Sequence, residues 1–288
     1  MIEVFIFLIP SFVACLIIIG VLGYLGMHVL KREIIFIDIA LAQIAATGAA
    51  LAHMFAAEHS HDGGKLFERM VALSFTLIAA AFFSFAAKKI AKISQETVIG
   101  ISYAISAAGT LFFLGLSAGS DVHMEEMFAG SILWAQWDAI ILCSSVYAAV
   151  GLFHYIFRSN FIALSTNYNK ADQSGMNVML WDFLFYASMG VVITFTVEIT
   201  GVLLTFAFLI IPATFSALFS DRWGIRLLIA WILGLVVTII GLFISYSLDF
   251  SCGPALVAIM GLALIGAAII KKSFSITKRS ELKHDSGR

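Results

Sequence analysis

The chain has 288 residues, of which 61% are hydrophobic and only 12% are charged, against about 25% charged in an ordinary soluble domain. This composition excludes a water-soluble globular enzyme and predicts an all-α, polytopic integral membrane protein, because each membrane-spanning helix takes about 20 mostly apolar residues. The net charge of −1 excludes the overall basic field typical of nucleic-acid binding, so we expect membrane lipid and no nucleic acid as a partner.

Continuous apolar runs predict about nine membrane helices, with a range of eight to ten, because only a helix satisfies its backbone polar groups within one segment of the bilayer. In chain order the predicted helices cover 4–30, 36–55, 71–87, 97–117, 132–157, 183–197, 201–219, 225–247 and 254–270. Only Glu198, Ile199 and Thr200 join the sixth run to the seventh, so this pair forms either a tight hairpin or one interrupted helix. No linker divides the chain, and we expect one transmembrane permease domain over 1–288.

The basic residues predict the orientation, because Lys and Arg concentrate in short cytoplasmic loops. With the N-terminus outside, all but two of the 17 Lys and Arg residues fall in predicted cytoplasmic segments, including a basic tail over about 271–288. The two exceptions are Lys65 and Arg69. The pattern predicts a multi-pass protein with an external N-terminus and a cytoplasmic C-terminus.

The longest polar stretch on the predicted cytoplasmic side covers about 158–182. Loops of this length between membrane helices are uncommon unless they have a function. We expect this loop to hold a short amphipathic helix that lies along the cytoplasmic surface.

Polar residues in the second predicted helix are candidates for a transport path, because polar groups inside a membrane are costly. Gln43 and Thr47 are four residues apart and share one helical face, while Asp38 lies near the start of the run. Small residues surround them and allow close helix contact. Two interpretations stay open: these residues line the path, or the helix is tightly packed with Asp38 at the level of the lipid headgroups.

The loop that follows this helix combines imidazoles with carboxylates, the ligand types that suit zinc, manganese or ferrous iron. It is predicted to lie outside, where it could gather an ion. The candidate metal-binding residues are His53, Glu58, His59, His61 and Asp62. The alternative is a solvated turn in which histidines happen to cluster.

Two enzyme motifs are absent from the sequence. The chain has no Gly-x-x-x-x-Gly-Lys-Ser/Thr loop, so it cannot by itself bind ATP phosphates. It also lacks a His-Glu-x-x-His zinc helix, and its three isolated cysteines form neither a disulfide framework nor a CxxC metal site. We therefore predict a transport subunit that is not an enzyme and holds no permanent cofactor.

Several segments together resemble the permease subunits of bacterial ATP-binding-cassette importers for zinc, manganese or iron. The strongest is the run from Gly-Val-Leu-Leu to Ile-Ile-Pro-Ala at 201–213, and the others, in family order, cover 30–48, 128–134 and 244–261. The resemblance implies a homodimer in the bacterial inner membrane, two separate ATPase subunits that bind ATP, and an external metal-binding protein. It also implies a coupling helix around 164–176, with Asn167, Asp172, Ser174, Gly175 and Met176 as the contacts to the ATPase.

The sequence departs from the family pattern at two places. The family's Asp-Pro opening of the coupling helix is replaced by Asn167 and Tyr168. Family members often have Gly-Asp in the second helix and a His four residues after the Asp, where this chain, aligned on Gly48, has Asp38, Ile39 and Gln43. The resemblance therefore leaves open whether zinc, manganese or iron is the cargo and whether Asp38 and Gln43 form a variant site.

Two alternatives to an ATP-driven ion importer remain at this point. One is a secondary carrier or channel driven by an ion gradient, with Asp38 as its membrane carboxylate. The other is a related permease for a metal chelate such as haem or a siderophore, which would need a wider path.

Overall fold

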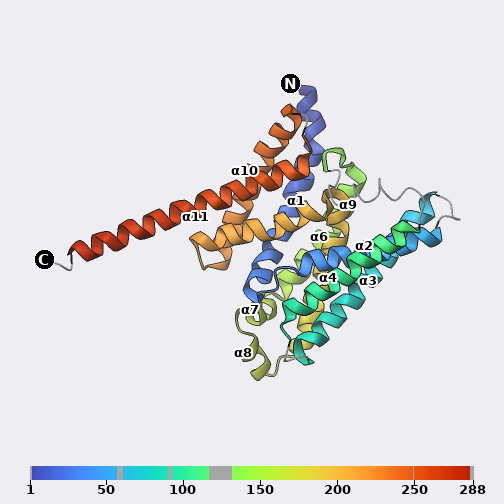
Figure 1. Ribbon diagram of the computed structural model, residues 1–288, viewed down its shortest axis with the longest axis horizontal. Helices are drawn as coiled ribbons and strands as arrows, with labels where there is room; N and C mark the ends of the chain where they lie inside the picture. Colours follow the sequence, from blue (N-terminus) through green and yellow to red (C-terminus); the bar gives the residue numbers. More distant parts are fainter. Residues whose placement is uncertain (1, 57–60, 90–92, 117–131, 249, 286–288) are drawn as a thin grey trace.

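The computed structural model describes residues 2–56, 61–89, 93–116, 132–248 and 250–285 (Figure 1). These residues contain no strand, which confirms the predicted all-α fold. The elements are α1 (Ile2–Arg32), α2 (Ile37–Ala56), α3 (His61–Lys89), α4 (Gln95–Gly115), the 3-10 helix η1 (Ile132–Trp134), α6 (Trp137–Ile156), α7 (Arg158–Thr166), α8 (Tyr168–Gln173), α9 (Val178–Phe219), α10 (Trp223–Leu248) and α11 (Cys252–Asp285).

Eight helices in the described part of the chain are long and apolar enough to cross a membrane. The 42-residue α9 contains both the sixth and the seventh predicted runs. Gly201, with φ 72° and ψ 169°, interrupts it between the two runs. Glycine adopts this conformation easily because it has no Cβ. The sixth and seventh runs are therefore two helical segments joined at a kink at Gly201, and the predicted range of eight to ten membrane helices is confirmed.

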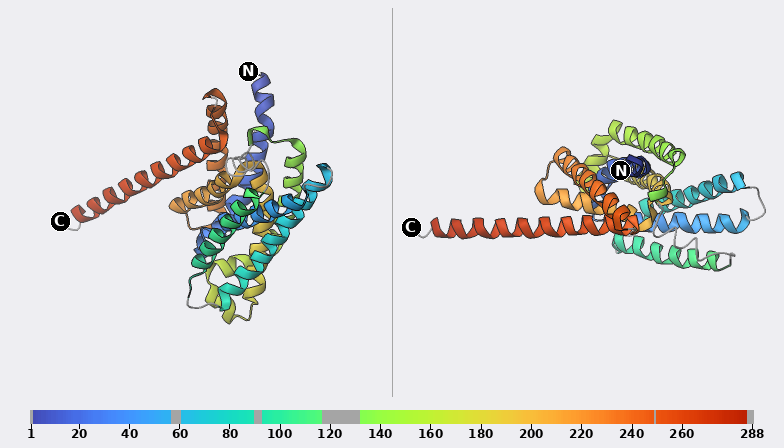
Figure 2. Two further views of the ribbon diagram at one scale, coloured as in Figure 1. Left: turned by 45° about the vertical axis from the view of Figure 1, so that its right-hand side comes forward. Right: turned by 90° about the horizontal axis from the view of Figure 1, so that it is seen from above.

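Helix α9 lies at the centre of the molecule and packs against α1, α2, α3, α6, α10 and α11. Helices α2, α3 and α4 form a group on one side of it, while α10 and α11 lie on the other side (Figures 1 and 2). The short helices α7 and α8 sit together at the end of the molecule opposite the N-terminus (Figure 1). Helix α9 therefore contacts the helices on both of its sides and the short helices α7 and α8.

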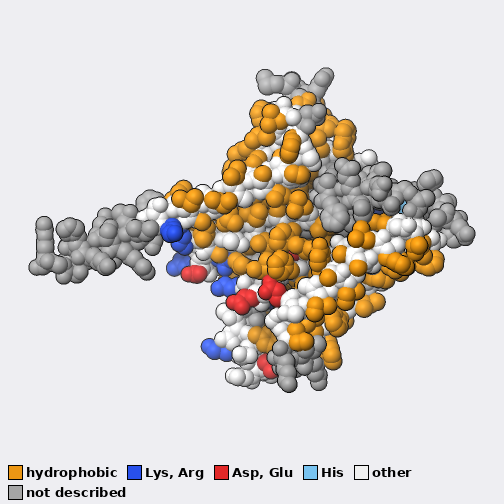
Figure 3. Space-filling view, viewed as in Figure 1, with side chains coloured by type: hydrophobic (Ala, Val, Ile, Leu, Met, Phe, Trp, Pro, Cys, Tyr) orange, Lys and Arg blue, Asp and Glu red, His pale blue; other side chains and the backbone are white. Residues whose placement is uncertain are grey.

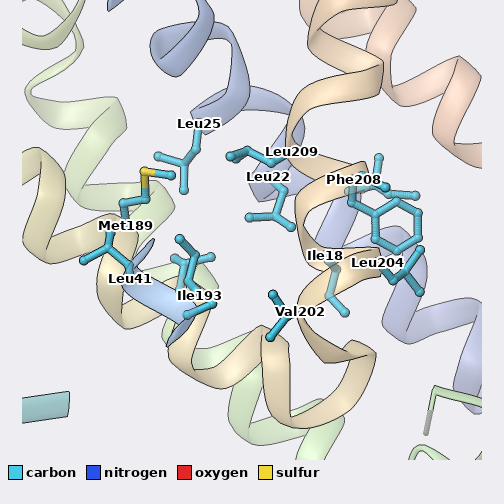
Figure 4. Close-up of a cluster of buried hydrophobic side chains, with 14 of the residues drawn as sticks. Ile18, Leu22, Leu25, Leu41, Met189, Ile193, Val202, Leu204, Phe208 and Leu209 are labelled. Atoms are coloured by element: carbon cyan, nitrogen blue, oxygen red, sulfur yellow. The ribbon is translucent and has the colours of Figure 1, made fainter. Parts of the chain in front are cut away.

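The core is formed where α1 and both halves of α9 meet (Figure 4). Its fully buried side chains are contributed mainly by these two helices, with one neighbour from α2: Ile18, Leu22, Leu25, Leu41, Met189, Ile193, Val202, Leu204, Phe208 and Leu209. Lipid tails are as apolar as these residues, so close van der Waals packing rather than exclusion of water holds the helices together. The three cysteines, Cys15, Cys143 and Cys252, are buried and free.

The outer surface carries an extensive apolar cover suited to lipid. Large side chains on α3, α4, α10 and α11 are mostly exposed, among them Ile78, Phe112, Phe243 and Leu262. Figure 3 shows hydrophobic side chains over most of the drawn face, with Lys, Arg, Asp and Glu gathered in its lower part. The distribution is that of a protein with an apolar belt in the bilayer and a charged end outside it.

Small residues bring α2 against its neighbours, as the sequence predicted. A Cβ added to Gly48 would lie 3.0 Å from the Phe75 ring and 3.1 Å from the Cα atom of Ala72 on α3. One added to Gly109 on α4 would lie 3.1 Å from the Thr47 methyl group. Close approach of this kind is typical of small residues between membrane helices.

Candidate functional site

Gln43 and Thr47 belong to a buried polar network that joins α2 to α4. The Gln43 amide Nε2 donates to Thr110 Oγ1 at 2.9 Å, and the hydroxyls of Thr47 and Thr110 lie 2.9 Å apart. Thr47 Oγ1 is also 2.8 Å from the carbonyl oxygens of Gln43 and Ser106. Gln43 Oε1 has no hydrogen-bond partner among the described residues. The network therefore contains one buried oxygen that could accept a further hydrogen bond or contact a cation.

A cavity of about 300 Å³ opens beside this network, between α2, α3, α4 and α9. Alanines of α2 form much of the cavity wall, and their small side chains do not fill the space between the helices. Its polar lining comes from all four helices and consists of His53, Glu68, Thr110, Thr194 and Glu198. Thr110 belongs to both the cavity and the Gln43 network, which makes the two features continuous.

Two pairs of polar side chains border the cavity near the end of α2 that is predicted to lie outside: a His–Glu hydrogen bond and an Arg–Glu ion pair. His53 Nδ1 is 2.9 Å from Glu68 Oε1 across α2 and α3. Arg69 Nε lies 3.0 Å from both carboxylate oxygens of Glu198, and Arg69 Nη2 lies 2.9 Å from Oε2. Both pairs are partly exposed. One imidazole and two carboxylates therefore face one cavity. These are ligand types that divalent cations take, but in this structure the three groups do not lie closely enough together to hold an ion.

Asp38 does not join this cavity. It lies in the first turn of α2, 1% exposed, and neither carboxylate oxygen has a hydrogen-bond partner in the part of the chain that is described. His53 is in the last turn of the same helix, about 22 Å away along its axis at 1.5 Å per residue. Of the three predicted path residues, the structure brings Gln43 and Thr47 together and places Asp38 apart from them.

The predicted metal-binding loop lies largely beyond the described residues. Glu58 and His59 are outside them, and the side chains of His61 and Asp62, at the start of α3, are not described. Among the side chains that are described, no three His, Cys, Asp or Glu residues gather closely enough to hold a metal ion. The loop site remains a prediction, and its one described member, His53, is paired with Glu68.

The polar stretch 158–182 was predicted to hold a short amphipathic helix. It holds two short helices, α7 and α8, and its last residues form the start of α9 at Val178. Asn167 separates the two short helices, because its extended backbone ends α7 and its Oδ1 atom accepts the Lys170 N–H at 2.9 Å to cap α8. An asparagine N-cap provides the same acceptor as an aspartate. Asn167 therefore supplies the side-chain cap that begins this helix.

The other residues predicted to contact an ATPase lie at or just after the end of α8, where the structure gives most of them a local role. Ser174 Oγ donates to the Ala171 carbonyl at 2.7 Å, and Gly175 has a φ of +83° that turns the chain after the helix. Met176 packs on a small buried cluster of Leu164, Ala171 and Val178. Asp172 is exposed on α8. The segment thus exposes polar side chains such as Asp172 on one side and packs on the small apolar cluster on the other.

Tyr168, at the start of α8, faces acidic neighbours. Partial burial, together with the nearby carboxylates of Asp182 and Asp172, raises the pKa of Tyr168 to about 12. The phenol is therefore neutral at physiological pH and keeps its O–H donor.

The fold is that of a multi-helix membrane protein with a cavity between α2, α3, α4 and α9. The chain belongs to the ABC 3 transport family, whose sequence pattern matches residues 4–271. It is a multi-pass membrane protein of an ABC transport system.

Named relatives and a solved structure agree with this assignment. The chain is 24% identical over 267 residues to the manganese transport system membrane protein MntC of Listeria monocytogenes, covering 90% of each protein. It is 21% identical over 262 residues to a Haemophilus influenzae protein named "Probable iron transport system membrane protein", covering 91% of this chain and 89% of that one. A chain of PsaBC from Streptococcus pneumoniae, solved in complex with Fab, is similar with a TM-score of 0.74 and 21% identity, covering 91% of this chain and 90% of that chain.

Proposed function

We propose that this chain is the transmembrane permease subunit of an ATP-driven importer of a divalent metal ion, either zinc, manganese or iron. The observation that carries the proposal is the cavity in which His53, Glu68 and Glu198 lie beside the Gln43 network. Relatives named for iron and manganese transport support the class of cargo.

The cavity and the network together would carry the ion through the apolar interior. A bare divalent ion cannot enter hydrocarbon, because burying an unpaired charge is prohibitive. The imidazole and carboxylates would receive the ion at the predicted outer end, and the amide and hydroxyl oxygens of Gln43, Thr47 and Thr110 would replace part of its water further in.

The remaining parts of the transporter would be separate proteins. A second copy of this chain would complete the path, an external metal-binding protein would deliver the ion, and two ATPase subunits would bind ATP and contact the segment α7–α8. With the N-terminus outside and the C-terminus in the cytoplasm, this segment lies on the cytoplasmic side, where those subunits are expected.

An ion-gradient carrier is the second candidate, and Asp38 is the residue that favours it. Its buried carboxyl, without partners among the described residues, is of the type that proton-coupled carriers use within a membrane. In that case uptake would need no ATPase.

Reconstitution separates these two functions. The chain is incorporated into proteoliposomes with its ATPase and binding protein, and uptake of Mn²⁺, Zn²⁺ and Fe²⁺ is measured with ATP. We expect uptake of at least one ion that disappears when the ATPase is omitted. Undiminished uptake without the ATPase would reject the ATP-driven importer in favour of the carrier.

The turn after α8 gives a prediction for coupling. Gly175 occupies the left-handed region, where a β-branched residue is strained by about 1–2 kcal/mol. Replacing Gly175 with Val should shift α8 and reduce the number of ions moved per ATP severalfold, whereas Gly175→Asn, which tolerates this backbone, should stay near the wild type. Equal coupling ratios in the Val and Asn variants would contradict the role of the turn.

A further inference from the structure

A buried arginine connects α7 to both helices of the core. Arg32, in the last turn of α1, donates from Nη1 to Asp182 Oδ1 on α9 at 2.8 Å and from Nε to Ser165 Oγ on α7 at 2.8 Å. The two charged side chains are 7% and 2% exposed. The guanidinium also lies over the Phe185 ring, 4.0 Å from its centroid. One side chain of α1 therefore contacts both α7 and α9 at the same point.

A second residue of α1 holds the same serine. His28 Nδ1 lies 2.8 Å from Ser165 Oγ and, like the serine, is buried. Two residues of α1, His28 and Arg32, thus hold Ser165. This serine lies in the last turn of α7, close to the start of α8. Because α7 packs on α1 and α9, a displacement of α7–α8 reaches both long helices through this contact.

The contact is incomplete on both sides of the ion pair. Arg32 Nη2 and Asp182 Oδ2 are buried and make no close hydrogen bond among the described residues. The Tyr168 and Tyr186 side chains lie near enough to interact with Asp182 and Arg32, respectively. A cavity of about 290 Å³ borders the pair and is lined by Arg32, Ser165, Tyr168 and Asp182, among others. Arginine and a carboxylate form their strongest contact with two parallel hydrogen bonds, and the space beside them permits a rearrangement to that form.

We infer that Arg32 is the positioning residue through which movement of α7–α8 reaches α1 and α9 during the transport cycle. The structure shows the single bond, and the two-bond pair would be a second arrangement of the kind that a mechanical link between packed helices requires. This inference rests on the proposed function, in which the ATPase subunits act on α7–α8.

The test uses the full transporter in proteoliposomes and compares Arg32→Gln, Asp182→Asn and the exchanged pair Arg32→Asp with Asp182→Arg. Each single variant is expected to lower the number of ions moved per ATP at least tenfold while the ATPase subunit still copurifies. The exchanged pair should recover part of that ratio. Arg222→Gln, which removes a cation from the exposed α9–α10 turn, is the matched control and should behave as the wild type.

A wild-type ratio in either folded single variant would overturn the inference. If both single variants fail to fold, Ser165→Ala, which removes one hydroxyl, is expected to lower the ratio two- to threefold, and an unchanged ratio there overturns it equally. If the wild type shows no ATP-dependent uptake, the proposed function fails instead. In that case hydrogen exchange of the permease alone decides: loss of the Arg32 guanidinium should speed exchange across 158–176 about tenfold, and unchanged exchange rejects the link.

Discussion

Replacing Gly26 with alanine should destabilise the protein more than the same change at either of the other two glycines of α1, Gly20 and Gly23. An ideal Cβ at this position would lie 1.9 Å from the Leu209 carbonyl oxygen and 3.1 Å from the Ala213 Cβ on α9. The obstacle is backbone, which cannot rotate away as a side chain can, so α1 must separate from the central helix. We expect a loss of about 3 kcal/mol or more, measured as a lower thermal unfolding midpoint in detergent.

The same helix offers a matched control. A Cβ added to Gly20 would meet nothing within 4 Å, so Gly20→Ala should be neutral or slightly stabilising because alanine favours the helix. Comparison of the two alanine variants isolates the contact between α1 and α9 from helix propensity. Equal unfolding midpoints would show that these two helices do not approach each other this closely.

Removing His53 and Glu68 together should nearly abolish uptake at low metal concentration. The imidazole and the carboxylate, 2.9 Å apart, supply two of the three strong donors that face the cavity. Loss of even supporting groups around a metal weakens binding about tenfold to a hundredfold. We therefore expect the combined variant His53→Ala, Glu68→Gln to raise the metal concentration needed for half-maximal uptake at least about tenfold.

The control for this variant is Glu96→Gln, which removes a carboxylate from the first turn of α4, away from the cavity. Its uptake should match the wild type. ATP hydrolysis should remain in the cavity variant, because the segment α7–α8 is untouched. Unaltered uptake by the cavity variant would exclude His53 and Glu68 from the path of the ion.

Much of the fold could be predicted because a membrane helix is a local property of the sequence. Each spanning run is long and apolar enough to be recognised without knowledge of its neighbours. The joint at Gly201 could not be resolved in this way, since a hairpin and a kinked helix need the same apolar runs and differ in the backbone angles of one glycine. The division of the polar loop at Asn167 is equally local to one side-chain cap.

The candidate site was only partly predictable, for the opposite reason. Gln43 and Thr47 share a helical face, and spacing alone places them together. The partners of Arg69 and Arg32 lie 129 and 150 residues away along the chain, and no periodicity connects such positions. One signal for the Arg69–Glu198 pair did exist in the sequence. Arg69 lies on the predicted outer side, against the rule that basic residues concentrate in cytoplasmic loops, and a basic residue at such a position suggests a nearby acidic partner.

The central claim is that this permease moves a metal ion with energy from a partner ATPase, and accumulation against a gradient tests it most directly. Proteoliposomes holding the complete transporter are loaded with the transported ion at ten times its external concentration, and the internal metal is followed after ATP is supplied to the ATPase side. We predict a further rise in internal metal with ATP and none with an imposed proton gradient alone. Accumulation driven by the proton gradient without ATP, or equilibration of the two concentrations, would contradict the account.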